Sequence, residues 1–72
     1  MNPSIVNFLS RHDLIEVNEY LFEMLGYEYD YEKAQDQSRE QLLKDLKKCV
    51  GQVGHQTYMD VCMGMLQSRL DH

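Results

Sequence analysis

Apolar residues recur every three or four positions along much of this chain, which is the spacing that places them on one face of an α-helix. The clearest series is Leu14, Val17, Leu21 and Leu25. Asp13 and Glu16 resemble a capping box at its start, and Gly26 stands where a left-handed residue commonly follows a helix. The spacing predicts a helix over 14–25 with Asp13 as its N-cap.

A second helical series follows in the second half of the chain. Ser38 and Gln41 occupy the two ends of another capping box. The apolar residues after it are Leu42, Leu43, Leu46, Cys49, Val50 and Val53. Because Gly51 and Gly54 mark the end of this series, we predict a helix over 39–50.

The last predicted helix begins at His55 or Thr57 and ends at Leu70. Its apolar positions are Tyr58, Met59, Val61, Cys62, Met63, Met65, Leu66 and Leu70. These residues cover more than one face, which indicates a helix that is either central in the fold or carries an interface.

The N-terminus and the middle of the chain are less regular. Asn2 suits an N-cap and Pro3 suits the first position of a helix, so we predict a helix over 3–11. Residues 27–32 alternate strictly between tyrosine and an acid, which is typical of a strand. No convincing partner strand is present, and an isolated strand is not stable. We therefore expect a connecting segment with a short helical turn that begins near Tyr31.

Together these elements predict an all-α fold, a compact bundle of four to five short helices in a single domain over residues 1–72. A chain of this length buries a thin core, and we expect a net stability of about 3–5 kcal/mol. The apolar fraction of 43% is too high for a disordered chain.

Several segments resemble the sterile alpha motif, a five-helix protein-interaction domain of about this length. Residues 4–9 (SIVNFL) are similar to its first helix, residues 14–22 to its second, and residues 38–43 (SREQLL) to the start of its fourth. Gly54 and His55 are similar to the Gly-His pair that opens its last helix, whereas Phe8 stands where the family commonly has tryptophan. The resemblance implies a non-enzymatic module that forms homotypic or heterotypic helical contacts.

The net charge of −5 is unevenly distributed. Residues 1–37 contain eight acids and two bases, a balance of −6, whereas residues 38–72 contain four acids and five bases, a balance of +1. The first half would repel a phosphate backbone, so we expect no direct binding of nucleic acid. A basic protein surface is a better partner, because long-range attraction would speed the encounter.

No apolar run approaches the roughly 20 residues that a membrane span needs, and we expect no membrane partner and no signal peptide. Cys49 and Cys62 both lie within apolar helical patterns. This suits reduced core thiols in a cytoplasmic or nuclear protein better than a disulfide, although the two could meet near the open end of a helical hairpin.

The sequence predicts no metal, cofactor or catalytic site. Cys49, His55 and Cys62 lack the closely spaced ligand pairs of structural zinc sites. A cysteine nucleophile needs a nearby base and a cleft that removes water from the substrate, and a domain this small offers little room for one. The row Glu16, Glu19 and Glu23 would lie on one open helical face, where each acid has the same solvated surroundings.

Two surfaces are candidates for binding. The first is an acidic surface interleaved with tyrosines: Glu19, Glu23, Tyr27, Glu28, Tyr29, Asp30 and Tyr31. Tyrosine is enriched at interfaces, and its ring can hold a lysine or arginine by a cation–π contact. The alternative interpretation is that one or two tyrosines fill gaps in the core and the acids only interact with water.

The second candidate surface is on the last helix, where we expect self-association through Met59, Met63, Gly64 and Leu66. Methionine adapts to irregular binding surfaces. Gly64 costs its helix about 1 kcal/mol relative to alanine, which indicates a close helix–helix approach inside the fold or across a dimer. The alternative interpretation is an ordinary core with a glycine that helps packing.

These features predict a non-catalytic interaction module or adaptor that binds a basic protein surface and self-associates through its last helix. The rival hypothesis is a small acidic inhibitor of the kind that phages make. Such an inhibitor would occupy the nucleic-acid-binding groove of an enzyme by presenting carboxylates in place of phosphates.

Overall fold

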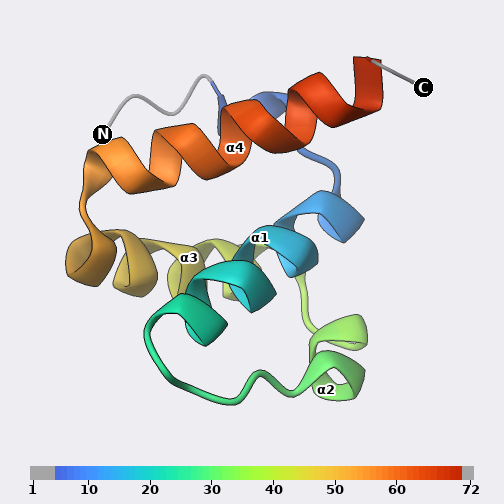
Figure 1. Ribbon diagram of the computed structural model, residues 1–72. Coiled ribbons are helices and arrows are strands. Elements are labelled where there is room, and N and C mark those ends of the chain that lie inside the picture. The colour runs from blue at the N-terminus through green and yellow to red at the C-terminus, as the bar shows by residue number, and fades with distance from the viewer. Residues whose placement is uncertain (1–4, 71–72) are drawn as a thin grey trace.

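The computed structural model describes residues 5–70, with only the backbone described at 69 and 70. Its elements are the 3-10 turn η1 (Val6–Phe8) and the α-helices α1 (Arg11–Met24), α2 (Tyr31–Gln35), α3 (Arg39–Val53) and α4 (His55–Leu70). Residues 5–70 contain no strand, and the prediction of a small all-α bundle is confirmed (Figure 1).

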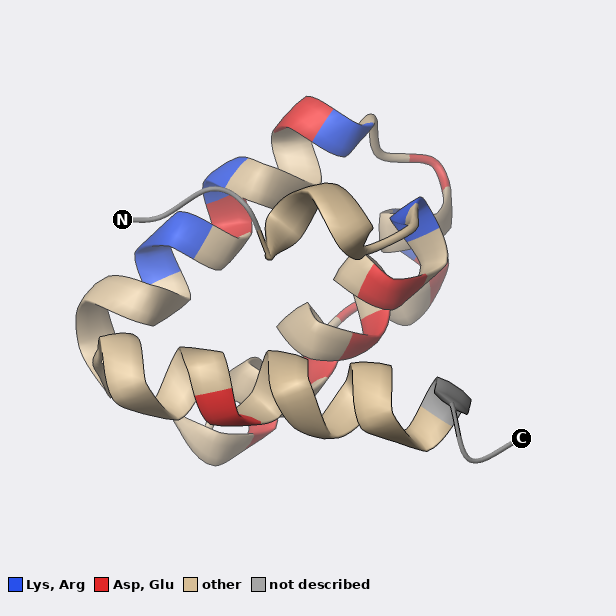
Figure 2. Ribbon diagram, turned by 90° about the horizontal axis from the view of Figure 1, so that it is seen from above, with Lys and Arg blue, Asp and Glu red and all other residues tan. Residues whose placement is uncertain are grey.

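The helices surround one core. α1 makes its most extensive contacts with α3, the long helix α4 crosses over this pair, and the short helix α2 lies beside α1 (Figure 1). Seen from above, α3 and α4 diverge from the turn that joins them, and η1 sits between the two (Figure 2). The N-terminal segment therefore closes the open side of the angle between α3 and α4.

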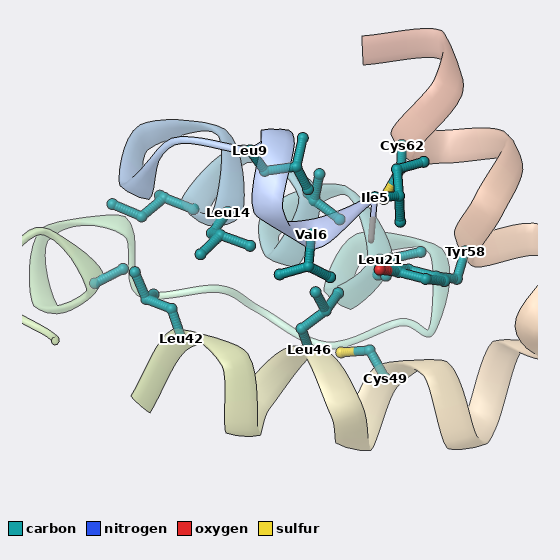
Figure 3. Packing of buried hydrophobic residues seen from close by; sticks show 13 residues of the cluster. Ile5, Val6, Leu9, Leu14, Leu21, Leu42, Leu46, Cys49, Tyr58 and Cys62 are labelled. Carbon is teal, nitrogen blue, oxygen red and sulfur yellow. The ribbon is translucent and has the colours of Figure 1, made fainter. Parts of the chain in front are cut away.

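The buried side chains come from η1 and its two flanking residues and from each of the helices α1 to α4. They form one cluster (Figure 3). They are Ile5, Val6, Leu9, Leu14, Ile15, Val17, Leu21, Ala34, Leu42, Leu46, Cys49, Tyr58 and Cys62. Tyr58 is fully buried and is the largest of them. Burying a side chain of this size contributes on the order of 1.5–3 kcal/mol, so the Tyr58 ring adds substantially to the attachment of α4.

α1 begins one turn earlier than the sequence predicted. Ser10, not Asp13, is the N-cap: its Oγ accepts a hydrogen bond from the backbone N–H of Asp13 at 3.1 Å, and Asp13 Oδ2 accepts one from the N–H of Ser10 at 2.9 Å. Asp13 is thus the third residue of the helix and the last residue of a Ser-x-x-Asp capping box, which satisfies two N–H groups at the helix start at once. The predicted end is confirmed, because Gly26 follows the helix with φ +86°.

The helix predicted over 3–11 is wrong over the described part of that range. Only the single 3-10 turn Val6–Phe8 forms, and the chain is extended at Leu9 (ψ 130°) before α1 starts. Ile5, Val6 and Leu9 are all buried, and this turn lets three closely spaced residues reach the core while Ser10 caps the next helix. The predicted start at Asn2 and Pro3 lies outside the described residues.

α3 extends three residues beyond its predicted end. It passes through Gly51 and stops at Val53, where Gly54 takes φ +95° as the C-cap. Val53 packs against the core cluster, and that contact outweighs the roughly 1 kcal/mol that Gly51 costs a helix. α2 begins at Tyr31 as predicted, with Asp30 Oδ1 accepting from the N–H of Lys33 at 3.0 Å.

Two arginines at the starts of α1 and α3 hold the fold together in a reciprocal way. Arg39, the first residue of α3, donates to the carbonyl oxygens of Val6 (3.0 Å) and Leu9 (2.9 Å), in the segment that leads into α1. Arg11, the first residue of α1, donates to Gln37 O (2.9 Å from Nε and 2.6 Å from Nη2) in the segment that leads into α3. Arg11 Nη2 also donates to the carbonyls of Ala34, at 3.2 Å, and Gln35. The first residue of each helix therefore holds the segment that leads into the other helix.

The substitution Arg39→Met is expected to reduce the free energy of unfolding by about 1–3 kcal/mol, because two hydrogen bonds from a charged donor to half-buried carbonyls are lost. Urea unfolding followed by circular dichroism measures the change. Lys47→Met on the exposed face of the same helix is the control, and it is expected to change stability by less than about 0.5 kcal/mol. Equal stabilities of the two variants would contradict the structural role of Arg39.

Candidate functional site

A groove of about 620 Å³ runs between α1 and α4 and is the larger of two hollows described for residues 5–70. Residues of α1 line one side of it and residues of α4 line the other. They are Glu16, Glu19, Tyr20, Glu23, Met24, Thr57, Asp60, Val61, Gly64 and Met65. On α4 these positions recur at three and four, so they share one helical face. We call this feature the α1–α4 groove.

Four carboxylates line the α1–α4 groove. Glu16, Glu19 and Glu23 follow one another over two turns of α1, a length of about 10 Å, and Asp60 comes from α4. Glu16 Oε1 lies 3.1 Å from His12 Nε2, and Asp60 Oδ1 accepts from Gln56 Nε2 at 3.0 Å. Neither Glu19 nor Glu23 forms an ion pair with any basic side chain that the structure describes. Among the side chains that the structure describes, the negative charge of the groove is therefore largely uncompensated.

Most of the basic side chains that the structure describes either donate to backbone carbonyls or lie exposed on α3. Arg11 and Arg39 are committed to backbone carbonyls, as described above. Lys44, Lys47 and Lys48 are exposed on α3, which carries most of the blue positions in Figure 2. Within residues 55–68 of α4 the only Lys, Arg, Asp or Glu is Asp60. The fold thus separates an acidic α1–α4 side from a basic α3 side.

Apolar surface lies between the carboxylates. Tyr20 and Met24, both from α1, are 56% and 49% exposed. Val61 and Met65 on α4 are half-buried and also line the groove. The combination of an apolar lining with carboxylates suits a ligand that has an apolar surface and positive charge.

The structure divides the acidic tyrosine surface that the sequence predicted. Glu19 and Glu23 line the α1–α4 groove, whereas residues 27–31 do not. Tyr27 is 53% exposed at the other side of α1, where its hydroxyl lies 3.3 Å from Gln52 Oε1 of α3. Glu28 is exposed in the connection to α2, and the Asp30 carboxylate is occupied as the N-cap of that helix.

Tyr29 and Tyr31 are half-buried and pack against the core cluster. The Tyr29 ring meets the Phe22 ring edge-on, with 4.8 Å between ring centroids. Burial raises the pKa of Tyr29, and the neighbouring side chain of Asn18 lowers it by a smaller amount. The alternative interpretation, in which one or two of these tyrosines fill gaps in the core, describes Tyr29 and Tyr31.

The predicted self-association residues also fall into different surroundings. Met63 is 56% exposed, whereas Met59 and Leu66 are half-buried and pack against the core cluster. Gly64 lines the α1–α4 groove. Apart from its chain neighbours and the backbone of its own helix, no heavy atom that the structure describes lies within 4 Å of the position that a Cβ of Gly64 would occupy. Gly64 therefore makes no close helix–helix approach within the described fold, and the space beside it is open to a second molecule.

Sequence reasoning missed Tyr20, Met24, Asp60 and Val61 as parts of a binding site, and it grouped Met65 with the other methionines of the last helix rather than with the acids of α1. The row Glu16, Glu19 and Glu23 was visible as an acidic face of one helix. What could not be read from spacing is that α4 lies beside that face. The spacing of three and four also places Thr57, Asp60, Val61, Gly64 and Met65 on one face of α4, but it does not show which helix that face meets.

The two cysteines are free thiols buried in the core. Burial, and to a lesser degree the Asp45 carboxylate, raises the pKa of Cys49, and burial also raises the pKa of Cys62. Because reactive cysteines need a lowered pKa and access to solvent, this environment favours packing over nucleophilic chemistry. No group of three or more His, Cys, Asp or Glu side chains suited to a metal ion occurs among the described residues.

No protein-family model matches this chain, and no curated protein or solved structure is significantly similar to it. The resemblance to the sterile alpha motif therefore stays a prediction from short sequence segments. Among the helices described, none has the length and apolar character to cross a membrane.

The buried Tyr58 side chain is expected to make the unfolding free energy depend on pH in the alkaline range. Burial, followed by the neighbouring Cys62 thiol, raises the pKa of Tyr58 from 10.0 to about 12. The folded state therefore holds this proton more tightly than the unfolded state. The resulting stability is present below pH 10 and is lost as the pH rises through 10 towards 12, by at most about 1.4 kcal/mol per pH unit.

The substitution Tyr58→Phe is expected to flatten the fall in unfolding free energy above pH 10. At pH 7 it is expected to change stability by less than about 1 kcal/mol, because the buried Tyr58 hydroxyl has the weakly hydrogen-bonding Cys62 thiol as its neighbour and no stronger partner among the described residues. Urea unfolding from pH 7 to pH 11.5 tests both statements, with Tyr20→Phe on the exposed groove lining as the control. If the Tyr58→Phe profile overlays that of the unmodified chain, Tyr58 does not titrate as a buried group.

Proposed function

We propose that this chain is a non-catalytic protein-interaction module of the cytoplasm that binds a basic protein surface through the α1–α4 groove. The observation that carries the proposal is the set of four carboxylates, Glu16, Glu19, Glu23 and Asp60, around an apolar lining. Within the described structure Glu19 and Glu23 lack a basic partner, so a ligand can supply one.

Charge and shape act at different stages of binding. The acidic side would attract a basic partner over roughly one Debye length, about 8–10 Å at physiological salt, and would speed the encounter. Contact with Tyr20, Met24, Val61 and Met65 would then exclude water, and the Tyr20 ring is placed to receive a cation. Affinity is expected to fall as salt concentration rises, because the carboxylates at the groove face solvent.

The rival function is the acidic inhibitor that blocks a nucleic-acid-binding enzyme. Its support is the row of carboxylates along α1. A mimic of nucleic acid has to enter the groove of its target, which requires carboxylates on a projecting surface. Here the acids surround a hollow with an apolar lining, an arrangement that receives a partner. The adaptor function is therefore the better supported of the two.

Self-association through α4 remains part of the proposal. Met63 is exposed beside Met59 and Leu66 on one face of α4, and this face is separate from the one that lines the groove. The resemblance to the sterile alpha motif implies the same class of function. Light scattering of the purified chain at several concentrations measures the oligomeric state.

Charge reversal tests the proposed surface. The double substitution Glu19→Lys and Glu23→Lys is expected to reduce binding of a partner about tenfold or more and to leave the helical circular dichroism unchanged. The immobilised chain is used to capture proteins from extracts of its native source. Mass spectrometry identifies them, and titration calorimetry with the purified partner measures affinity at low and physiological salt.

The matched control is Glu28→Lys with Glu32→Lys, which adds the same charge away from the groove. It is expected to weaken binding by less than about threefold. Loss of binding in this control but not in the Glu19 and Glu23 variant would move the site to the segment between α1 and α2. Capture of a nucleic-acid-binding enzyme whose substrate competes with the chain would favour the inhibitor.

A further inference from the structure

We infer that the occupant of the α1–α4 groove is an amphipathic α-helix of a partner protein, with an apolar stripe flanked by lysine or arginine. The inference rests on the proposed function, since it specifies the conformation and pattern of the basic partner. It is carried by the backbone chemistry of the groove walls, by the spacing of the groove's carboxylates and by the open space at Gly64.

The walls of the groove offer few backbone groups to a ligand. Most of the lining comes from interior turns of α1 and α4, whose N–H and C=O groups are paired within each helix, and only Glu23 and Met24 at the end of α1 and Thr57 in the first turn of α4 lie at helix ends. An extended peptide that enters such a groove would leave its own backbone groups unpaired against an apolar lining, which is unfavourable. A helix satisfies its backbone internally, so it can present side chains alone.

The carboxylates of α1 have the repeat of a helix. Glu16, Glu19 and Glu23 are separated by three and four residues, and two turns of a partner helix that lies along α1 would place lysines at the same repeat. Asp60 on α4 then faces the opposite flank of that helix. An apolar stripe between the two flanks would meet Val61 and Met65. Charge complementarity thus requires basic side chains on both flanks of the partner helix.

Gly64 is the position where the partner helix can come closest. Helices pack with their axes about 8–10 Å apart, and the short distances need small residues at the contact. The space around the Cβ position of Gly64 is open, so an occupant of the groove meets no side chain of another element there. This supplies a reason for a glycine that otherwise costs α4 about 1 kcal/mol.

A second copy of this chain fits the groove less well. Among the side chains that the structure describes, the exposed basic cluster lies on α3 and consists of Lys44, Lys47 and Lys48. The apolar residues of α3 that such an occupant would insert, Leu42, Leu46 and Cys49, are already buried in the chain's own core. The occupant therefore has to come from another protein.

The test uses two synthetic peptides of about five helical turns, roughly 18 residues. Both have the same content of leucine, alanine and lysine. One places leucine at helical spacing with lysine on both flanks, and the other alternates leucine and lysine. Fluorescence anisotropy of the labelled peptides measures their affinity for the intact chain. The helical-pattern peptide is expected to bind at least tenfold more tightly, and to gain helical circular dichroism on binding.

Gly64→Trp tests the position of closest approach. It is expected to weaken binding of the helical-pattern peptide at least tenfold, because the indole occupies the space that the peptide needs. Gly51→Trp is the matched control, since Gly51 is also a helical glycine with open space at its Cβ position but lies outside the groove. Both variants are expected to stay folded, which their melting temperatures check.

The outcomes separate the inference from the proposed function. Equal affinities for the two peptides, or unchanged affinity of Gly64→Trp, would overturn the helix-in-groove inference and leave the acidic surface standing if Glu19→Lys with Glu23→Lys still weakens binding. If that charge reversal has no effect on either peptide, the proposed function fails as well. Because the peptide comparison uses the unmodified chain, it decides the inference even where a variant does not fold.

Discussion

The reciprocal hydrogen bonds of Arg11 and Arg39 are the constraint on which the rest of this small fold depends. Each arginine follows a serine N-cap, and each reaches back to carbonyl groups in the segment that leads into the other helix. The carbonyls of Leu9 and Gln37 would otherwise be half-buried with no hydrogen bond that the structure describes, which is costly. With both helix starts fixed, α1 and α3 lie side by side, and Tyr58 of α4 closes the core between them.

This use of arginine has an electrostatic consequence. The chain has seven lysines and arginines and twelve acidic residues. Two of the basic side chains, Arg11 and Arg39, donate their hydrogen bonds to backbone carbonyls. Lys44, Lys47 and Lys48 lie on α3, so nothing described near Glu19 and Glu23 neutralises them. The arginines that stabilise the fold are therefore not available to neutralise the acids of the α1–α4 groove. The proposed binding surface follows from how the bases are distributed as much as from how many acids there are.

Local chemistry explains which parts of the structure the sequence could predict. The end of α1 at Gly26, the start of α2 near Tyr31 and the span of α4 were predictable because glycine, cap residues and helical spacing act over a few neighbours. The 3-10 turn at Val6 could not be predicted, because Ile5, Val6 and Leu9 are held by tertiary burial.

Only part of the α1–α4 groove could be predicted from the sequence. The acids of α1 share a face by spacing alone, but Asp60 joins them only through the packing of α4, and Tyr29 leaves the predicted surface because its ring covers Phe22.

Amide chemical-shift mapping tests the assignment of the binding face most directly. The ¹⁵N-labelled chain is titrated with the leucine- and lysine-containing helical peptide, and changes in the ¹H–¹⁵N spectrum are followed residue by residue. The largest changes are expected within residues 16–24 of α1 and 57–65 of α4, on both walls of the α1–α4 groove. Changes confined to residues 27–31, or to the α3 face around Lys44 and Lys47, would contradict a binding site in that groove.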